Sequence, residues 1–185
     1  MPGPDVRVAT SADREAIVDT VLAAFVADPA FRYFFPTDAS YAEETRLFVG
    51  ELLDQRLAFG TVWVVEDGAA VSMWNPPGPT HAALPAGLSA ETAGRINRFD
   101  AQVRDLMPAD PHWYLGIVAT HPDHGGRGWG RLAMEPGLER SRTDGRPAYL
   151  ETVTAVNVGI YERYGWRLAA TTQVDQIEVR IMRNP

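Results

Sequence analysis

The sequence predicts a mixed α/β fold, in which helices flank one central sheet of about seven strands. Two β-branched runs on either side of Asp67-Gly68 indicate an antiparallel hairpin in the front half of the chain. A strand, a glycine-rich loop, a helix and a second strand follow over residues 113–153, as in a parallel crossover. Because the β-α unit does not repeat throughout, a doubly wound fold is excluded.

The spacing of apolar residues assigns each element in turn. "VRVAT" alternates as a strand over residues 6–10, and Ser11 is the expected N-cap of a helix over residues 12–28. The further predicted elements are a short aromatic-rich turn or helix at 29–36, a helix at 41–59, the two hairpin strands, a helix at 88–106, strands at 113–120 and 148–153, a short helix at 157–165 ended by Gly165, and two closing strands over 166–182.

Composition narrows the classes of function. A chain of 185 residues, 45% of them hydrophobic, fits one domain over residues 1–185. The chain has no cysteine, so an acyl-cysteine intermediate and a cysteine metal site are excluded, and we expect no metal. A net charge of -7 argues against a nucleic-acid partner. The N-terminus lacks the basic and apolar segments of a leader, and the chain has no long apolar run, so we expect a cytoplasmic protein without a membrane partner.

The segment "HPDHGGRGWGRLAM", residues 121–134, is the most informative motif. It places four glycines within six residues, ahead of a predicted helix. Successive backbone N–H groups from Gly126 to Arg131 can point at phosphate oxygens, and the helix adds the positive end of its dipole. Arg127 and Arg131 can add charge-assisted contacts. The segment therefore predicts an anion cradle.

Two ligands compete for this cradle, a dinucleotide and the pyrophosphate of coenzyme A. Residues 128–133, "GWGRLA", satisfy G-x-G-x-x-A, and Glu151 follows about 20 residues later at a strand end. The dinucleotide motif should, however, open the first βαβ unit directly after its strand, whereas residues 122–125 intervene here and the unit lies late in the chain. A nicotinamide oxidoreductase is therefore the weaker alternative, and a surface turn without a ligand is another.

The same segment resembles motif A of the GNAT acetyltransferase superfamily, V-x-P-x-x-(Q/R)-G-x-G-x-(G/A). Pro122, Gly126, Gly128 and Gly130 fall on this pattern in register. The following "YLETVTAVNVGIYERYGWRL" resembles the family's L-E-T...N-x-x-x-Y-E-x-x-G-F segment, with Trp166 in place of phenylalanine. Further similarity to the puromycin N-acetyltransferase-like branch spans nearly the whole chain.

Two positions depart from the family pattern. Gly125 stands where the family has glutamine or arginine, so one side-chain contact to the pyrophosphate is missing. Thr120 replaces the usual valine at the end of the preceding strand. Arg127 is a candidate to compensate for the first change, and neither change removes the backbone donors.

The resemblance implies a GNAT fold with one splayed parallel strand pair, and acetyl-CoA as donor. It implies N-acetylation of a primary amine of a small molecule, with antibiotics and related metabolites among the candidate acceptors. The amine attacks the thioester directly through a tetrahedral intermediate, whose oxyanion the N–H of Val118 can stabilise. The implied acetyl-CoA site comprises Ile117, Val118, Ala119, Thr120, Gly125, Gly126, Arg127, Gly128, Trp129, Gly130, Arg131 and Asn157.

The resemblance also assigns catalytic roles. Tyr161 matches the tyrosine that the family places near the sulfur, and a phenol of pKa about 10 is a suitable general acid for the leaving thiolate; packing of the short helix is its alternative role. Glu151 is the first candidate for the general base, and a structural strand-end carboxylate is the alternative. His112 and Glu66 are weaker base candidates. Asn157 could instead be a helix N-cap.

The acceptor pocket is expected from the N-terminal helices and the central hairpin, which are rich in aromatic residues. An apolar pocket with few polar groups suits a drug-sized amine, although aromatic residues are more often core. Asp28 is placed to attract the ammonium group. The predicted acceptor-binding residues are Phe25, Asp28, Phe31, Phe34, Trp74 and Trp113.

The sequence is also compatible with two other functions. A protein lysine or N-terminal acetyltransferase would use the same donor, and a non-catalytic acyl-CoA-binding sensor would use the cradle alone. The chain is expected to be a monomer or a homodimer, because its closing strands could pair across a dimer.

Overall fold

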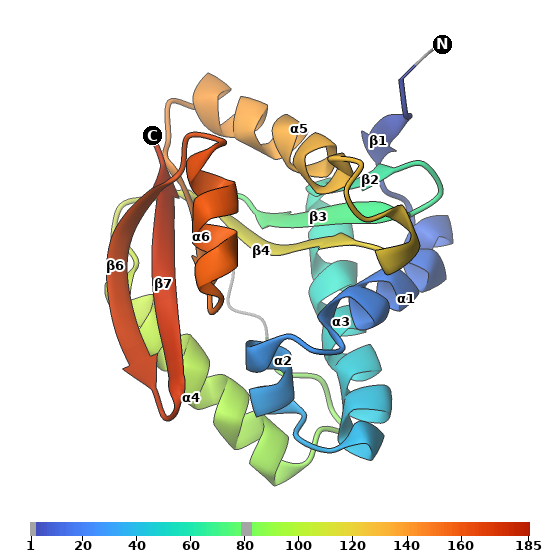
Figure 1. Ribbon diagram of the computed structural model, residues 1–185, viewed down its shortest axis with the longest axis vertical. Helices are drawn as coiled ribbons and strands as arrows, with labels where there is room; N and C mark the ends of the chain where they lie inside the picture. Colours follow the sequence, from blue (N-terminus) through green and yellow to red (C-terminus); the bar gives the residue numbers. More distant parts are fainter. Residues whose placement is uncertain (1–2, 79–82) are drawn as a thin grey trace.

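The computed structural model describes residues 3–78 and 83–185. Within these residues, seven strands form one mixed sheet in the order β1-β2-β3-β4-β5-β7-β6 (Figure 1). Every neighbouring pair is antiparallel except β4 and β5, which confirms the predicted mixed α/β fold. The elements are β1 (Val6–Val8), α1 (Arg14–Phe25), α2 (Pro29–Phe34), α3 (Asp38–Phe59), β2 (Val62–Val65), β3 (Ala70–Asn75), α4 (Ala90–Leu106), β4 (Trp113–Thr120), α5 (Trp129–Thr143), β5 (Ala148–Thr152), α6 (Ala155–Glu162), β6 (Arg167–Val174) and β7 (Ile177–Asn184).

The start of α1 corrects one prediction. Ser11 does not cap the helix, because it lies inside a 3-10 turn formed by Ser11–Asp13. The Asp13 carboxylate instead accepts hydrogen bonds from the backbone N–H and the hydroxyl of Thr10, at 2.8 and 3.0 Å. Thr10 is the N-cap of the 3-10 turn, and Asp13 is the N-cap of α1.

β4 carries a bulge that changes the direction of its later side chains. Met73 pairs with Ile117 and the adjacent Trp74 pairs with Leu115, so Gly116 is the extra residue on β4. A bulge of this kind exchanges the faces on which the following side chains lie. Past the bulge the strand also leaves its parallel neighbour, because β4 and β5 pair only from Trp113 to Tyr114. The two parallel strands are therefore splayed along the rest of β4.

Two apolar clusters cover opposite faces of the sheet. On one face α1, α2, α3 and α4 pack around residues such as Val64, Ile117 and Ile181. On the other face, α5 and α6 pack against a cluster that contains Trp74 and Leu150. Figure 1 shows α5 along the top of the view and α6 beside β7.

Gly137 allows α5 to lie directly against the sheet, and its replacement is a test of this packing. A Cβ at Gly137 would overlap the indole of Trp74, at 2.5 Å from Nε1. Trp74 is fully buried and donates to Ser72, so the ring cannot move away freely. We expect Gly137→Ala to lower the free energy of unfolding by about 1–3 kcal/mol, as overpacking does.

Urea unfolding monitored by tryptophan fluorescence measures this change. The matched control is Gly94→Ala in α4, where the new methyl group has open space near Arg98. That change should stabilise the chain by about 0.5–1 kcal/mol through helix propensity. Equal stability of the two variants would contradict the described packing of α5.

Candidate active site

A cavity of about 740 Å³ lies where β4 and β5 separate. Its wall includes Glu151 from β5 and Tyr161 from α6. The side chain of Tyr161 belongs to the cluster on the α5 face, whereas Tyr149, two residues before Glu151 on β5, belongs to the opposite cluster. Because side chains alternate along a strand, Glu151 faces the α1–α4 side. The cavity therefore passes between the splayed strands and is lined from both faces of the sheet.

Glu151 is held by a neighbour on β4. The hydroxyl of Tyr114 donates to Glu151 Oε2 at 2.6 Å. Burial raises the pKa of Glu151 to about 7, although the hydrogen bond from Tyr114 acts in the opposite direction. Burial, followed by the charge of Glu151, raises the pKa of Tyr114 well above its ordinary value, so Tyr114 keeps its proton. Glu151 can therefore exchange a proton near neutral pH.

Tyr161 presents a free hydroxyl to the same cavity. Its side chain is buried, and its ring meets that of Trp166 edge-on at 6.0 Å. Its hydroxyl forms no hydrogen bond with the described residues. Burial, with smaller contributions from the charges of Glu151 and Asp28, raises the pKa of Tyr161. The phenol thus carries a proton at neutral pH and is available to a ligand.

The end of the cavity nearest α2 combines aromatic walls with one carboxylate. Phe25, Phe31 and Phe34 line it, as predicted from the sequence. Asp28 lines it too, but its Oδ1 already accepts from the backbone N–H groups of Ala30 and Phe31, at 2.9 and 3.1 Å. Burial raises the pKa of Asp28, against these two bonds. Asp28 therefore caps α2 and retains its second oxygen for a cation.

Trp74 and Trp113 lie elsewhere, which corrects their assignment to the acceptor pocket. Both side chains are buried in the cluster beneath α5 and neither lines the cavity. Trp74 donates to Ser72 at 3.1 Å, and Trp113 donates to Asp144 at 2.8 Å. The two rings meet edge-on at 6.5 Å. They support the sheet rather than the cavity.

The weaker base candidates differ in position. His112 lines the cavity, and its Nδ1 lies 2.8 Å from the carbonyl oxygen of Asp110. Glu66 lies outside the cavity, in the β2–β3 turn, where it accepts from the backbone N–H of Asp5 at 3.1 Å. Glu66 is thereby excluded as a direct base.

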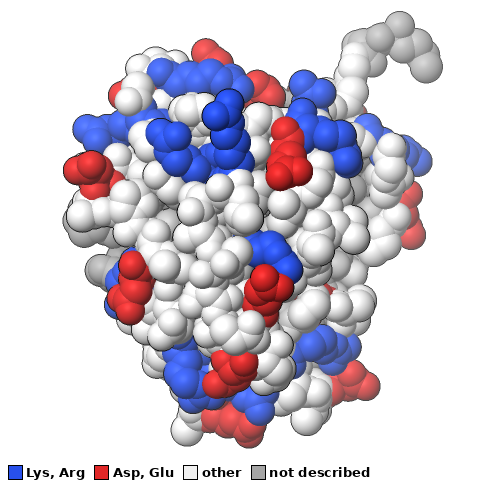
Figure 2. Space-filling model, turned by 60° about the vertical axis from the view of Figure 1, so that its left-hand side comes forward, with Lys and Arg blue, Asp and Glu red and all other residues white. Residues whose placement is uncertain are grey.

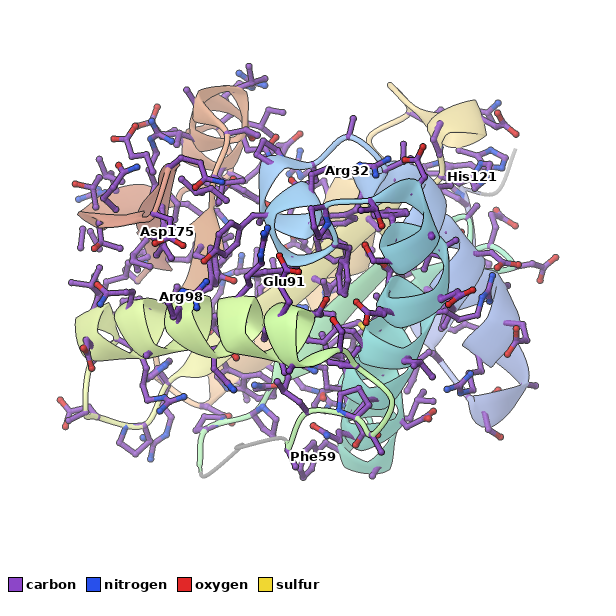
Figure 3. The ribbon with its side chains drawn as sticks, turned by 90° about the horizontal axis from the view of Figure 1, so that it is seen from below. Arg32, Phe59, Glu91, Arg98, His121 and Asp175 are labelled. Atoms are coloured by element: carbon purple, nitrogen blue, oxygen red, sulfur yellow. The ribbon has the colours of Figure 1, made fainter. Side chains whose placement is uncertain are left out.

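Polar contacts join the β6–β7 turn to two of the helices that contribute to the cavity. Tyr33 on α2 donates to Asp175 in the β6–β7 turn at 2.6 Å, and Arg98 on α4 lies 3.6 Å from the same carboxylate. Figure 3 shows Arg98 and Asp175 directed toward each other, with His121 on the far side of the molecule. These contacts tie the β6–β7 turn to the helices that cover the cavity.

The glycine loop has the geometry of an anion cradle. The described residues accept no hydrogen bond from the backbone N–H groups of residues 126–131, and the first helical bond runs from Leu132 to Gly128. Gly126 and Gly128 have φ of 74° and 75°, which side chains rarely tolerate. Gly130 lets α5 approach β4, because a Cβ there would lie 3.1 Å from Thr120 Oγ1. The residues present therefore fit a phosphorylated ligand such as coenzyme A.

Gly125 differs from the other loop glycines. Its φ is -56° and its ψ is 151°, which any residue adopts. A Cβ there would lie 3.2 Å from the carbonyl oxygen of Pro122, a tight but local contact. The backbone thus does not require glycine at this position.

Aromatic contacts hold the two loop arginines. Arg127 lies over the ring of Trp129 at 5.1 Å, and Arg131 lies over Tyr164 at 5.1 Å. The ring of Trp129 also stacks against that of His124, with the ring centroids 4.9 Å apart. Each guanidinium group is therefore held against an aromatic ring.

Asn157 does not cap α6, which removes its alternative role. The N-cap of α6 is Thr154, and Asn157 lies one turn inside the helix, where its N–H donates to the carbonyl of Thr154 at 3.2 Å. Asn157 lines the cavity. Its side chain is therefore placed for contact with a ligand.

The polar cavity residues that the sequence did not predict include Arg56 on α3, Asp100 on α4 and Tyr114 on β4. Tyr114 and Glu151 are 37 residues apart, and no motif links them. Burial raises the pKa of Asp100 to about 6. The sequence offered one signal for Tyr114: it lies, with Gly116, on a strand that was predicted to run beside the strand of Glu151. That signal does not reveal the bulge at Gly116.

Charge is distributed unevenly over the molecule. Figure 2 shows arginine side chains gathered toward the top of the view, level with α5 in Figure 1, and the last turn of α5 carries Arg140 and Arg142. The cavity instead carries five carboxylates and two guanidinium groups, from Asp28, Glu51, Asp100, Asp110 and Glu151 and from Arg56 and Arg104. The interior of the cavity therefore favours a cationic ligand.

Two other kinds of site are absent from the described part of the chain. Its His, Asp and Glu side chains include no group of three or more arranged to hold a metal ion. None of the helices over residues 3–78 and 83–185 has the length and apolar character needed to cross a bilayer.

A sheet with one splayed parallel pair, a loop with open backbone donors at the end of β4 and a cavity lined by Glu151 and Tyr161 together fit an acyltransferase. The sequence profile of the acetyltransferase (GNAT) family matches residues 22–166. The chain therefore belongs to the acetyltransferase (GNAT) family, and it is an N-acetyltransferase.

Individual proteins agree with this assignment. An uncharacterized N-acetyltransferase of Schizosaccharomyces pombe is 27% identical, over 83% of this chain and 70% of the relative. A structure of histone acetyltransferase HPA2 and related acetyltransferase from Corynebacterium glutamicum is 25% identical, with a TM-score of 0.74, over 100% of this chain and 97% of that chain. Drosophila melanogaster polyamine N-acetyltransferase, which forms N-acetylagmatine, shares the fold at 16% identity, with a TM-score of 0.71, over 98% and 99% of the two chains.

Proposed function

We propose that the protein transfers an acetyl group from acetyl-CoA to the primary amine of a cationic small molecule. The observation that carries the proposal is the position of Glu151 and Tyr161, which line one cavity from opposite faces of the sheet. Such a pair can remove a proton from an amine on one side and supply a proton on the other.

The donor side is assigned to the cradle and the free edge of β4. Acetyl-CoA supplies a thioester whose carbonyl carbon is open to attack. Residues 126–131 bind the pyrophosphate, and Ile117 to Thr120 bind the arm that leads to the thioester, with Asn157 as a further contact. The backbone N–H of Val118 stabilises negative charge on the carbonyl oxygen.

The acceptor side supplies the proton chemistry. Glu151, in its ionised form, takes a proton from the amine as the C–N bond forms. Tyr161 donates its proton to the sulfur as the C–S bond breaks, and it regains one from Glu151 through water. No covalent intermediate with the protein is needed, in keeping with a chain that has no cysteine.

The form of the cavity supports a small acceptor. The aromatic wall of Phe25, Phe31 and Phe34 can hold an apolar body, and Asp28 can hold an ammonium group. The Drosophila structural neighbour is a polyamine N-acetyltransferase, and its acceptor is also a small amine. The resemblance to the puromycin N-acetyltransferase-like branch adds antibiotic amines to the candidate acceptors.

Release of free thiol tests the proposal. The protein is incubated with acetyl-CoA and a panel of aromatic amines, polyamines, antibiotic amines and lysine peptides. We expect at least one small amine to raise thiol release far above hydrolysis. Acetyl-CoA should also raise Tm, whereas NAD should leave it unchanged. Transfer only to peptides would favour a protein acetyltransferase, and binding without release to any amine would favour a sensor.

Gly125→Gln tests whether the loop lacks a useful contact. The new amide is expected to tighten acetyl-CoA binding by about 1 kcal/mol, or several-fold in Kd, because it adds one hydrogen bond to the pyrophosphate. Isothermal titration calorimetry measures this, with Gly125→Ala as the control for the added Cβ. An unchanged Kd in Gly125→Gln would mean that Arg127 and the backbone donors suffice.

A further inference from the structure

Arg56 lies beneath the β4 bulge with its guanidinium group inside the protein. The residue is 5% exposed, and it contributes to the cavity wall. Its Nη1 donates to the carbonyl of Leu52 at 2.8 Å. A Cβ on Gly116 would lie 3.0 Å from Nη2, so the guanidinium rests directly against the extra residue of the bulge.

Arg56 is close to the group that holds the proposed base. The same Cβ position on Gly116 lies 3.3 Å from the ring of Tyr114, so Arg56 and Tyr114 meet at the bulge. The hydroxyl of Tyr114 in turn donates to Glu151. The cation and the phenol thus both lie against Gly116 where β4 and β5 separate, and a hydrogen bond joins the phenol to the carboxylate.

The charge of Arg56 is not neutralised by an ion pair. Over residues 3–78 and 83–185, no carboxylate lies within ion-pairing distance of Arg56, and its Nε is buried without a hydrogen-bond partner. Burying a cation without an ion-pair partner lowers the stability of the folded protein, because the charge loses its hydration. Its field is also poorly screened, because little water separates it from its neighbours.

Other charged and titratable groups face Glu151 from the elements around it. Arg104 is exposed at the cavity rim, and Arg180 on β7 is paired with Glu178. Arg56 is therefore the buried cation with no carboxylate of its own. Among the described residues, the titratable and charged groups that line this cavity or border Glu151 are Asp28 on α2, Glu51 and Arg56 on α3, Asp100 and Arg104 on α4, Asp110 and His112 before β4, Tyr114 on β4, Tyr161 on α6 and Arg180 on β7.

We infer that Arg56 is a positioning residue whose fixed positive charge, set against the Gly116 bulge, favours the ionised form of Glu151 at neutral pH. Loss of this charge favours the protonated carboxyl group, and the protonated form cannot accept a proton from the amine. The charges of Arg56 and Asp100 both act on Glu151, and they act in opposite directions. The catalytic consequence rests on the proposed function, whereas the effect on the carboxyl group does not.

Carbon NMR of the full chain, labelled at the glutamate carboxyl carbons, measures the titration of Glu151 without any activity. Glu151→Gln assigns the signal. Arg56→Met is expected to move the midpoint upward by about half a pH unit or more, and Asp100→Asn to move it downward. Arg56→Lys should restore most of the wild-type midpoint. Arg46→Met, on the exposed face of the same helix, is the matched control and should change nothing.

The pH profile of kcat/KM supplies the second readout. The acid limb of Arg56→Met should move upward by the same amount as the NMR midpoint, with activity recovered at high pH. Folding of each variant is checked by Tm. A folded Arg56→Met with an unchanged Glu151 midpoint would overturn the inference. A shifted midpoint in a protein that acetylates no amine would uphold the inference and reject the proposed function instead.

Discussion

Replacing Glu151 with glutamine is expected to lower kcat/KM by roughly 10²–10⁴-fold, the usual contribution of a positioned general base. The amide keeps the size of the side chain and can still accept from Tyr114, so the cavity should retain its shape. Binding of acetyl-CoA should be unchanged, because the cradle at residues 126–131 lies at the other end of β4. Steady-state kinetics and calorimetry measure the two effects separately.

The pH dependence follows from the same carboxyl group. Glu151 acts as a base only when ionised, and burial raises its pKa to about 7. Wild-type kcat/KM should therefore fall as the pH drops below about 7, and this limb should be absent in Glu151→Gln. Glu66→Gln is the control that should leave both rate and profile intact. A limb that persists in Glu151→Gln and disappears in His112→Gln would assign the base to His112.

The contribution of Glu151 to stability should change with pH in the opposite direction to its contribution to activity. A carboxyl group whose pKa is higher in the folded chain than its ordinary value of 4.5 binds its proton more tightly when folded. Its contribution to stability is therefore lost as the pH rises from about 4.5 through about 7. Glu151→Gln should consequently have a Tm at pH 8 no lower than that of the wild type. A large fall in Tm would mean that Glu151 is mainly structural.

Tyr161→Phe is expected to lower kcat by about 10²-fold while leaving the Kd of acetyl-CoA unchanged. The change removes only the hydroxyl, which forms no hydrogen bond with the described residues, and the ring still packs against Trp166. The loss should be smaller for acetyl donors with better leaving groups, because such thiolates need less help from an acid. Stopped-flow and steady-state thiol release measure these rates.

Tyr149→Phe provides the matched control for Tyr161→Phe. Tyr149 is a buried tyrosine on β5 that does not line the cavity. Its replacement should leave kcat unchanged. Equal losses in the two variants would indicate a packing role for Tyr161, and an unchanged rate in Tyr161→Phe would exclude it as the acid.

Local patterns predicted the parts of the site that are contiguous in sequence. The loop glycines, their arginines and the following helix all lie within residues 121–143, so an anion cradle could be proposed from spacing alone. The β4-to-β5 crossover was predicted for the same reason, since a strand, a helix and a strand in succession form a parallel pair. The Asp67-Gly68 turn likewise placed the hairpin.

Long-range features were beyond such patterns. Arg56 on α3 contacts Gly116 on β4, far away in the sequence, and no local signal marks a buried arginine. The aromatic residues of the hairpin show the same limit, because Met73 and Trp74 are adjacent yet belong to clusters on opposite faces. The sequence shows that Trp74 is apolar but not which face it covers, and the bulge then exchanges faces along β4. This is why Trp74 and Trp113 were wrongly assigned to the pocket.

Transfer of a radiolabelled acetyl group tests the central claim most directly. All 17 lysine and arginine residues of this chain are arginines, so acetylation of its own lysines cannot account for thiol release. With a small amine acceptor, the label should appear on the amine in step with free thiol, and both should fall together in Glu151→Gln and Tyr161→Phe. Label that remains in acetyl-CoA, or that is released as acetate with every amine while acetyl-CoA still binds, would contradict the account.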